Sequence, residues 1–216
     1  MDLCFHNEVN IPVGELTMKG VLHIPSKAVA VVVFLHVKGS GWFCSRNQQV
    51  AELLHEMRVG TLLLDLFTAE EDKNYRHRFD VDLHAERLAA ATIWLKNYPV
   101  ARDCHIGYFV SGAWAAAALK TAAELPFVGA VVSRGGRPDL ARIDLPNVKA
   151  PTLFIVGSLD SDLLKINRDA FRQLVCEKQF ELLEGATPVF EGPGENEIIS
   201  ELAGNWFEKH LQPIVI

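Results

Sequence analysis

Hydrophobic residues in this chain form short continuous runs, separated by segments in which apolar positions recur with helical spacing. The longest run, residues 28–35, is continuous and rich in β-branched residues. Such a run is typical of a strand buried on both faces within a parallel sheet. Residues 46–58 have apolar side chains on one helical face, and 61–66 reads as a second buried strand. A long helix is predicted at 80–97, ended by Pro99.

The same alternation continues to the end of the sequence. Further strands are predicted at 104–109, 127–133, 152–157 and 179–183, further helices at 111–124, 162–175 and 195–210, and loops at 69–78 and 184–194. Residues 2–11 and 15–25 alternate roughly, which predicts an antiparallel hairpin. Alternating strands and helices imply right-handed crossovers, so the predicted class is α/β: a doubly wound, mostly parallel sheet with helices on both faces. The 216 residues suit one domain, 1–216.

Composition narrows the possible partners. The net charge is −6 with no block of like charge, which argues against nucleic acid as a partner. The four cysteines (Cys4, Cys44, Cys104 and Cys176) are scattered and include no CxxC pair. We therefore expect neither disulfides nor a metal site, no cofactor, and a cytoplasmic protein. The apolar runs are too short to span a bilayer and the N-terminus lacks a signal peptide, so no membrane association is expected.

Several short segments together carry a family resemblance. They are residues 34–36, 46–47, 62–66, 78–80, 85–88, 106–109, 132–140, 150–153 and 185–187. Through them the chain resembles the α/β-hydrolase superfamily over nearly its full length, and specifically the small dienelactone-hydrolase-like serine hydrolases. The resemblance implies an α/β-hydrolase sheet. It also implies acyl transfer by a serine, an acid and a histidine, in that order along the chain.

The triad implied by the resemblance is incomplete in this sequence. Asp160 stands at the position of the acid. Gly112 stands at the position of the nucleophile and Pro188 at that of the histidine, and no G-x-S-x-G motif occurs. The one histidine after Asp160 is His210, late in the last predicted helix. Hydrolysis by the family's usual triad is therefore not expected.

The departures from the family pattern converge on one expected pocket. Val110 and Trp114 stand where the family has glycine, and Val37 and Lys38 alter the loop that supplies an oxyanion-binding N–H. The expected lining is His36, Val37, Trp42, Phe43, Val110, Gly112, Trp114 and Pro188. Because the changes cluster, the sequence indicates deliberate remodelling, as in an engineered variant.

Lys38 is the leading candidate for a reactive group. It follows a central strand, where open α/β sheets bind ligands. Apolar neighbours would disfavour its ammonium form, and the free amine can form a Schiff base with a carbonyl. The sequence thus predicts a lyase of retro-aldol type, acting on an aromatic carbonyl substrate. Against this, loop lysines commonly reach solvent, and Asp160 nearby would raise the pKa of Lys38.

Two alternatives remain open. In the first, Ser111 or Cys44 is the new nucleophile of an ester hydrolase. His36 is the candidate base for Ser111, although the resemblance implies that this histidine supports the loop. Ser111 also suits the N-cap of the following helix, and a lone cysteine is commonly an inert buried thiol. In the second, the chain is a pseudo-hydrolase that binds an apolar small molecule without catalysis. Asp160 is expected to keep structural hydrogen bonds, and His84 to be partly buried or exposed.

Overall fold

The computed structural model describes residues 4–36, 45–68, 70–71, 77 and 80–211. Its strands are β1 (Phe5–Val13), β2 (Leu16–Ile24), β3 (Ala30–His36), β4 (Gly60–Asp65), β5 (His105–Gly112), β6 (Val128–Gly136), β7 (Thr152–Gly157) and β8 (Lys178–Leu183). The helices are α1 (Ser45–Glu56), α2 (Val81–Asn97), α3 (Trp114–Glu124), α4 (Ser161–Gln173) and α5 (Glu195–His210). Two short 3₁₀ helices, η3 (Pro138–Ala141) and η4 (Leu145–Asn147), follow β6.

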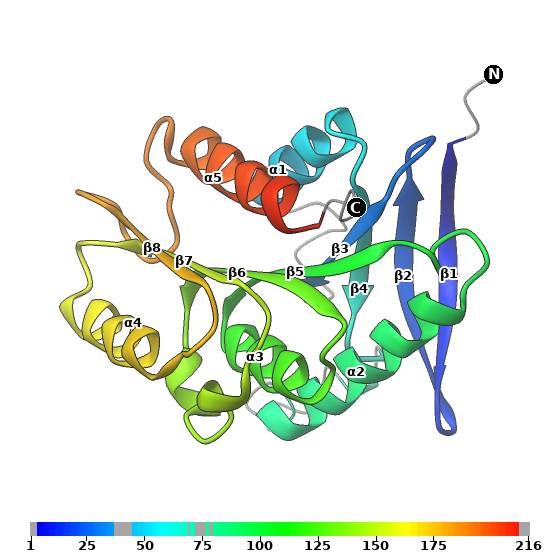
Figure 1. Ribbon diagram of the computed structural model, residues 1–216, viewed down its shortest axis with the longest axis horizontal. Helices are drawn as coiled ribbons and strands as arrows, with labels where there is room; N and C mark the ends of the chain where they lie inside the picture. The colour runs from blue at the N-terminus through cyan, green and yellow to red at the C-terminus, as the bar shows by residue number, and fades with distance from the viewer. Residues whose placement is uncertain (1–3, 37–44, 69, 72–76, 78–79, 212–216) are drawn as a thin grey trace.

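The strands form one sheet in the order β1-β2-β4-β3-β5-β6-β7-β8. Pairing from β4 through β8 is parallel, whereas β1 pairs with β2 and β2 with β4 in antiparallel fashion. Figure 1 shows α1 and α5 on one face of the sheet and α2, α3 and α4 on the other. This arrangement confirms the predicted doubly wound α/β-hydrolase sheet with an antiparallel N-terminal hairpin.

Strand β3 illustrates why the central strands are apolar throughout. Val31 and Val33 pack into the core cluster beneath α2 and α3, while Val32 and Phe34 pack into the cluster beneath α1 and α5. Successive side chains of a strand point to opposite faces, so a strand covered by helices on both sides must be apolar at every position. Among the described residues, no helix has the length and apolar character needed to cross a membrane.

The main difference from the predicted elements lies after the strand predicted at 104–109. Strand β5 continues to Gly112, and α3 begins at Trp114. The predicted helix start at Ser111 is therefore wrong, and Ala113 precedes the helix instead. Ser111 remains in the strand because its backbone still pairs with β6. The two 3₁₀ helices were also not predicted, since they are short and start near prolines rather than apolar repeats.

Buried polar contacts hold several of the described residues between β4 and α2. Arg87 of α2 is ion-paired with Glu71 and also donates to the carbonyl oxygen of Leu66, at 2.5 Å. His84 is fully buried, and its Nε2 lies 2.7 Å from the carbonyl oxygen of His77. The prediction of a partly buried or exposed His84 is wrong because its ring packs edge-on against Phe67.

Candidate active site

A bulge between β5 and β6 marks the carboxyl edge of the sheet. Ser111 pairs with Arg134, but Gly112 pairs with Gly136, so Gly135 is left over on β6. Both Gly112 (φ 56°) and Gly135 (φ 53°) have left-handed backbones. Bulges of this kind often lie beside active sites, because they redirect the chain and end the pairing. This bulge thus lies where the family resemblance puts the catalytic turn.

Gly112 forms an open turn. A Cβ added to it would meet no heavy atom within 4 Å. Its carbonyl oxygen accepts a hydrogen bond from the Arg137 amide at 2.8 Å, which ties the end of β5 to the segment after β6. Among the described residues nothing crowds this Cβ, so the cost of an alanine there would come from the positive φ.

The alternation along β5 decides which side chains share a face. Tyr108 and Val110 belong to the core cluster beneath α2 and α3, and Phe109 to the cluster beneath α1 and α5. Ser111 therefore projects, half-buried, on the α1 and α5 face. Val110 is buried on the opposite face, and Trp114 packs against the cluster that contains Val110. The structure thus separates Val110 and Trp114 from Ser111.

Arg134 is a site residue that the sequence reasoning did not single out. It is only 7% exposed, and its guanidinium carbon lies 5.5 Å from the centroid of the Phe109 ring. Because it pairs in register with Ser111, it brings a permanent positive charge to the strand next to that hydroxyl. The available signal was an arginine near the end of a mostly apolar strand, directly before two glycines.

The loop between β8 and α5 lies directly on the ends of β6 and β7. A Cβ on Gly135 would overlap the carbonyl oxygen of Pro188, and one on Gly157 would lie 2.5 Å from the carbonyl oxygen of Ala186. The amide of Leu159 also donates to the Ala186 carbonyl at 3.1 Å. Two glycines thus allow this loop to approach closely, and it brings Pro188 next to the bulge.

Asp160 follows β7 and caps α4. Its carboxylate accepts a hydrogen bond from the Leu163 amide at 2.9 Å. The positive end of the helix dipole stabilises a carboxylate in this position. Asp160 therefore makes the structural hydrogen bond expected of it.

Helix α3 starts at this same edge. Ala113 precedes it, and no side chain caps its N-terminus. The first N–H groups of a helix have no partner within the helix and carry a partial positive charge. The first turn of α3 therefore offers N–H donors immediately after Ser111 and Gly112.

The remaining predicted site residues belong to the loop after β3. Val37, Lys38, Trp42, Phe43 and Cys44 lie outside the described residues. The backbone of His36 ends β3 and pairs with Asp65 at the end of β4. Asp65 is 7% exposed, which is unusual for a carboxylate.

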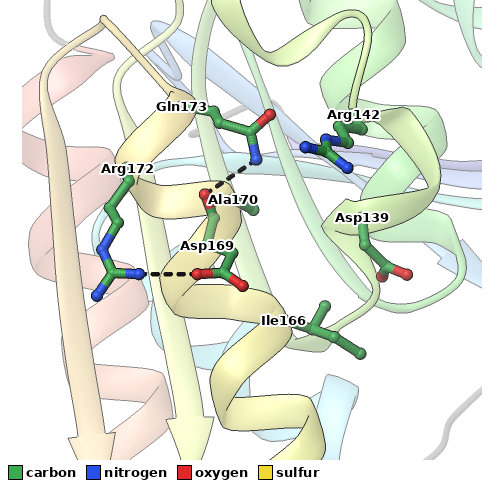
Figure 2. Close-up of a pocket in the computed structure, with 7 residues that line it drawn as sticks. All are labelled: Asp139, Arg142, Ile166, Asp169, Ala170, Arg172 and Gln173. Atoms are coloured by element: carbon green, nitrogen blue, oxygen red, sulfur yellow. Dashed lines mark hydrogen bonds and ion pairs between the residues drawn. The ribbon is translucent and has the colours of Figure 1, made fainter.

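A separate surface pocket of about 470 Å³ lies between η3 and α4. Figure 2 shows that its lining mixes acids and arginines, with Arg172 held by Asp169 at 2.8 Å. Asp139, also in the lining, is ion-paired with Arg137 at 2.8 Å. No described residue of β3 or β5 lines this pocket, so it is not the candidate site. In the described part of the chain, no three His, Cys, Asp or Glu side chains are grouped to hold a metal ion.

Comparison with known proteins agrees with the fold. No family model matches the sequence. A dienelactone hydrolase from Anabaena variabilis ATCC 29413 is 43% identical, with a TM-score of 0.92 over 97% of this chain and 99% of that chain. The esterase Est1E from Butyrivibrio proteoclasticus is 12% identical, with a TM-score of 0.78 over 94% of this chain and 98% of that one. The second likeness shows the fold alone.

A curated relative from Mycobacterium tuberculosis strain H37Rv, named "Putative phosphoribosyl transferase Rv0571c", is 43% identical over 205 residues. The match covers 94% of this chain but only 46% of that protein. The chain thus spans about half the length of the curated relatives that it matches.

These findings correct two predictions. The predicted retro-aldol lyase with Lys38 as Schiff-base amine is wrong, because the relative that shares 43% identity over nearly the full length is a dienelactone hydrolase. The engineered origin inferred from clustered changes receives no support either. The same likeness extends over 97% of this chain.

Proposed function

Because the chain belongs to the dienelactone hydrolase family of α/β-hydrolase-fold proteins, we propose that it hydrolyses esters of small molecules at the carboxyl edge of its sheet. The observation that carries this proposal is the 43% identity to a dienelactone hydrolase over 97% of the chain. We assign Ser111 as the nucleophile, since it is the hydroxyl nearest the open turn at Gly112.

The register across the sheet supports a base and an orienting acid for Ser111. His36 pairs with Asp65, and Ser111 pairs with Arg134. Continuing the pairing of Phe34 with Phe109 by two residues brings His36 level with Ser111. Neighbouring strands lie about 4.8 Å apart, so residues at one level are neighbours. The resulting row Asp65, His36, Ser111 has the order acid, histidine, serine that an activated hydroxyl requires.

The proposed reaction is a two-step acyl transfer. The hydroxyl of Ser111 attacks the ester carbonyl while His36 takes its proton, and the tetrahedral oxyanion forms. The alcohol leaves with the proton from His36, and an acyl group remains on Ser111. Water then attacks this acyl group with His36 again as base, which releases the acid and restores the serine.

Two groups at the edge suit the developing negative charge. The first turn of α3 offers N–H donors with no side-chain cap, and Arg134 adds a positive charge in the next strand. Donors and charges that are already oriented stabilise an oxyanion without reorganising. We assign Asp65, which pairs in register with His36, as the acid that stabilises the protonated histidine.

The family's own triad positions do not supply this chemistry. Gly112 offers no nucleophile, and the side chain of Pro188 cannot accept a proton. The carboxylate of Asp160 caps α4. A nucleophile one residue earlier, with its base on the neighbouring strand, keeps the reaction at the same edge. Phosphoribosyl transfer is not proposed, because the relative that carries that name is about twice as long as the part matched here.

Steady-state hydrolysis of p-nitrophenyl acetate and of a small lactone tests the proposal. Ser111→Ala and His36→Gln are each expected to lower kcat by roughly 10³-fold or more, as removal of a nucleophile or its base does. Cys44→Ala and Lys38→Met are the controls and should keep wild-type rates. Activity that is lost in Cys44→Ala but kept in Ser111→Ala would reassign the nucleophile. If the protein hydrolyses neither substrate faster than buffer does, the proposed hydrolase activity is wrong and a non-catalytic ligand-binding protein remains.

A further inference from the structure

Three histidines gather at the hairpin edge of the sheet, away from the candidate active site. His6 of β1 pairs with His23 of β2, and His23 pairs in turn with Thr61 of β4. His55, in the last turn of α1, stacks on His23 with ring centroids 3.9 Å apart. The three histidines and Thr61 come from four different elements. The sequence gives no hint of this cluster, because successive histidines in it are 17 and 32 positions apart.

The two strand histidines meet nitrogen to nitrogen. Nδ1 of His6 lies 3.1 Å from Nδ1 of His23, and the rings are inclined by 69°. At this distance one neutral imidazole donates its Nδ1–H to the lone pair of the other. Both nitrogens therefore face one small space, at the surface, on adjacent strands.

The surroundings fix the orientation of His23. Its Nε2 lies 3.4 Å from the sulfur of Cys4, on the side of the ring away from His6. The stacked ring of His55 covers one face and is itself held by a contact of 2.8 Å between its Nε2 and the Thr61 hydroxyl. Partners of this kind, which hold a ring in one orientation, are typical of histidines that bind metal ions.

We propose that His6 and His23 bind a divalent transition-metal ion, such as Zn²⁺ or Ni²⁺, through their Nδ1 atoms. Imidazole nitrogens bind these ions at about 2.0–2.1 Å, so nitrogens 3.1 Å apart subtend an angle of about 100° at the metal. This lies between the right angle of square-planar and octahedral sites and the tetrahedral angle. The exposed His6 side chain can turn so that both lone pairs point at the ion.

The protein neither gains nor loses a proton when it binds the ion. The imidazole that donated its Nδ1–H becomes the Nε2–H tautomer, so both rings stay neutral and both Nδ1 lone pairs bind the ion. In this tautomer the Nε2–H of His23 faces the sulfur of Cys4, which accepts it weakly. Water fills the remaining positions, because no third described His, Cys, Asp or Glu completes the group.

Metal binding would join β1 to β2 at the end of the hairpin opposite its turn. The ligands occupy opposed positions in an antiparallel pair, so an ion held by both binds the folded hairpin and not the unfolded chain. Such binding stabilises the folded state by mass action. The expected ion is of the borderline class that prefers imidazole nitrogen.

Isothermal titration of untagged full-length protein with ZnCl₂, and separately with NiCl₂, at pH 7.5 tests the site. One equivalent should bind to the wild type. His6→Ala and His23→Ala should each weaken binding by more than tenfold, and His55→Ala by roughly tenfold, as loss of an orienting partner does. His105→Ala removes an exposed histidine at the start of β5 and should bind like the wild type.

Two outcomes would overturn the proposal. One is that His6→Ala, an exposed change that leaves the core intact, binds the ion as tightly as the wild type. The other is that Cys4→Ser weakens binding far more than His6→Ala does, which would mean that the thiol and not the His6 nitrogen is the ligand. Ester hydrolysis by His6→Ala should remain at the wild-type rate, so this test is independent of the proposed activity.

Discussion

Ser111 and Arg134 pair in register on β5 and β6, at the last regular step before the bulge at Gly135. This pairing puts a hydroxyl and a buried guanidinium on one face of the sheet, beside the uncapped start of α3. The proposed nucleophile and the groups that would stabilise the oxyanion all lie at or next to this residue pair.

Arg134→Met should lower kcat/KM for an ester by about 10²-fold, because it removes a positive charge from the oxyanion's surroundings. Arg134→Lys keeps the charge and should recover part of that loss. Circular dichroism and melting of each variant will separate lost folding from lost catalysis. Equal activity of folded Arg134→Met and the wild type would remove Arg134 from the mechanism.

Gly112→Ala should destabilise the protein by about 1 kcal/mol, the usual cost of a left-handed backbone for an L-residue. No larger loss is expected, since the added Cβ meets open space. Gly14→Ala is the matched control, because Gly14 also has a positive φ (57°) and an empty surround. Urea unfolding measures both. A loss of several kcal/mol in Gly112→Ala alone would contradict the open turn.

Gly157→Ala should be more damaging, by about 2–3 kcal/mol, as overpacking against rigid atoms is. Its Cβ would lie 2.5 and 2.6 Å from the carbonyl oxygens of Ala186 and Thr187. Gly185→Ala, in the same loop and with open space around it, should cost only the strain of its positive φ. Thermal melting of the two variants compares them, and equal melting temperatures would contradict the close approach of this loop.

The pair Glu71 and Arg87 predicts a dependence of stability on acid. The Arg87 hydrogen bonds are the main cause that lowers the pKa of Glu71 from 4.5 to about 2. Because the folded state holds the carboxylate more readily than the unfolded chain, its contribution is complete above about pH 4.5. It declines as the pH falls towards 2.

Glu71→Gln should therefore lower the melting temperature near pH 7. Between pH 4.5 and 2, the melting temperature of this variant should fall less than that of the wild type. Glu177→Gln, at an exposed ion pair with Lys209, serves as the control and should change neutral stability little. An unchanged acid profile in Glu71→Gln would show that the pair does not contribute to folding.

The layers of this fold could be predicted from the sequence because they depend on local patterns. A strand covered on both faces is apolar, as β3 is from Ala30 to Leu35. Asp80 caps α2 where the helix was expected to begin. The start of α3 could not be predicted in this way. Ser111 is a good capping residue, yet pairing with β6 keeps it in the strand.

Less of the candidate site could be predicted from the sequence, because its residues become neighbours only when the strands pair in register. Arg134 was not singled out, since only pairing with β5 brings it beside Ser111. His6 and His23 are far apart in sequence and meet through the pairing of the hairpin. The resemblance directed attention to Gly112 and Pro188, which lack the family's nucleophile and base, rather than to the neighbouring row of Asp65, His36 and Ser111.

The decisive measurement of the role of Ser111 is mass-spectrometric mapping after treatment with a fluorophosphonate, because this reagent reacts preferentially with activated serines. The account predicts one adduct, on Ser111, which forms in step with loss of ester hydrolysis and is absent in both Ser111→Ala and His36→Gln. An active enzyme that keeps its full rate and carries no adduct on Ser111 would contradict the account.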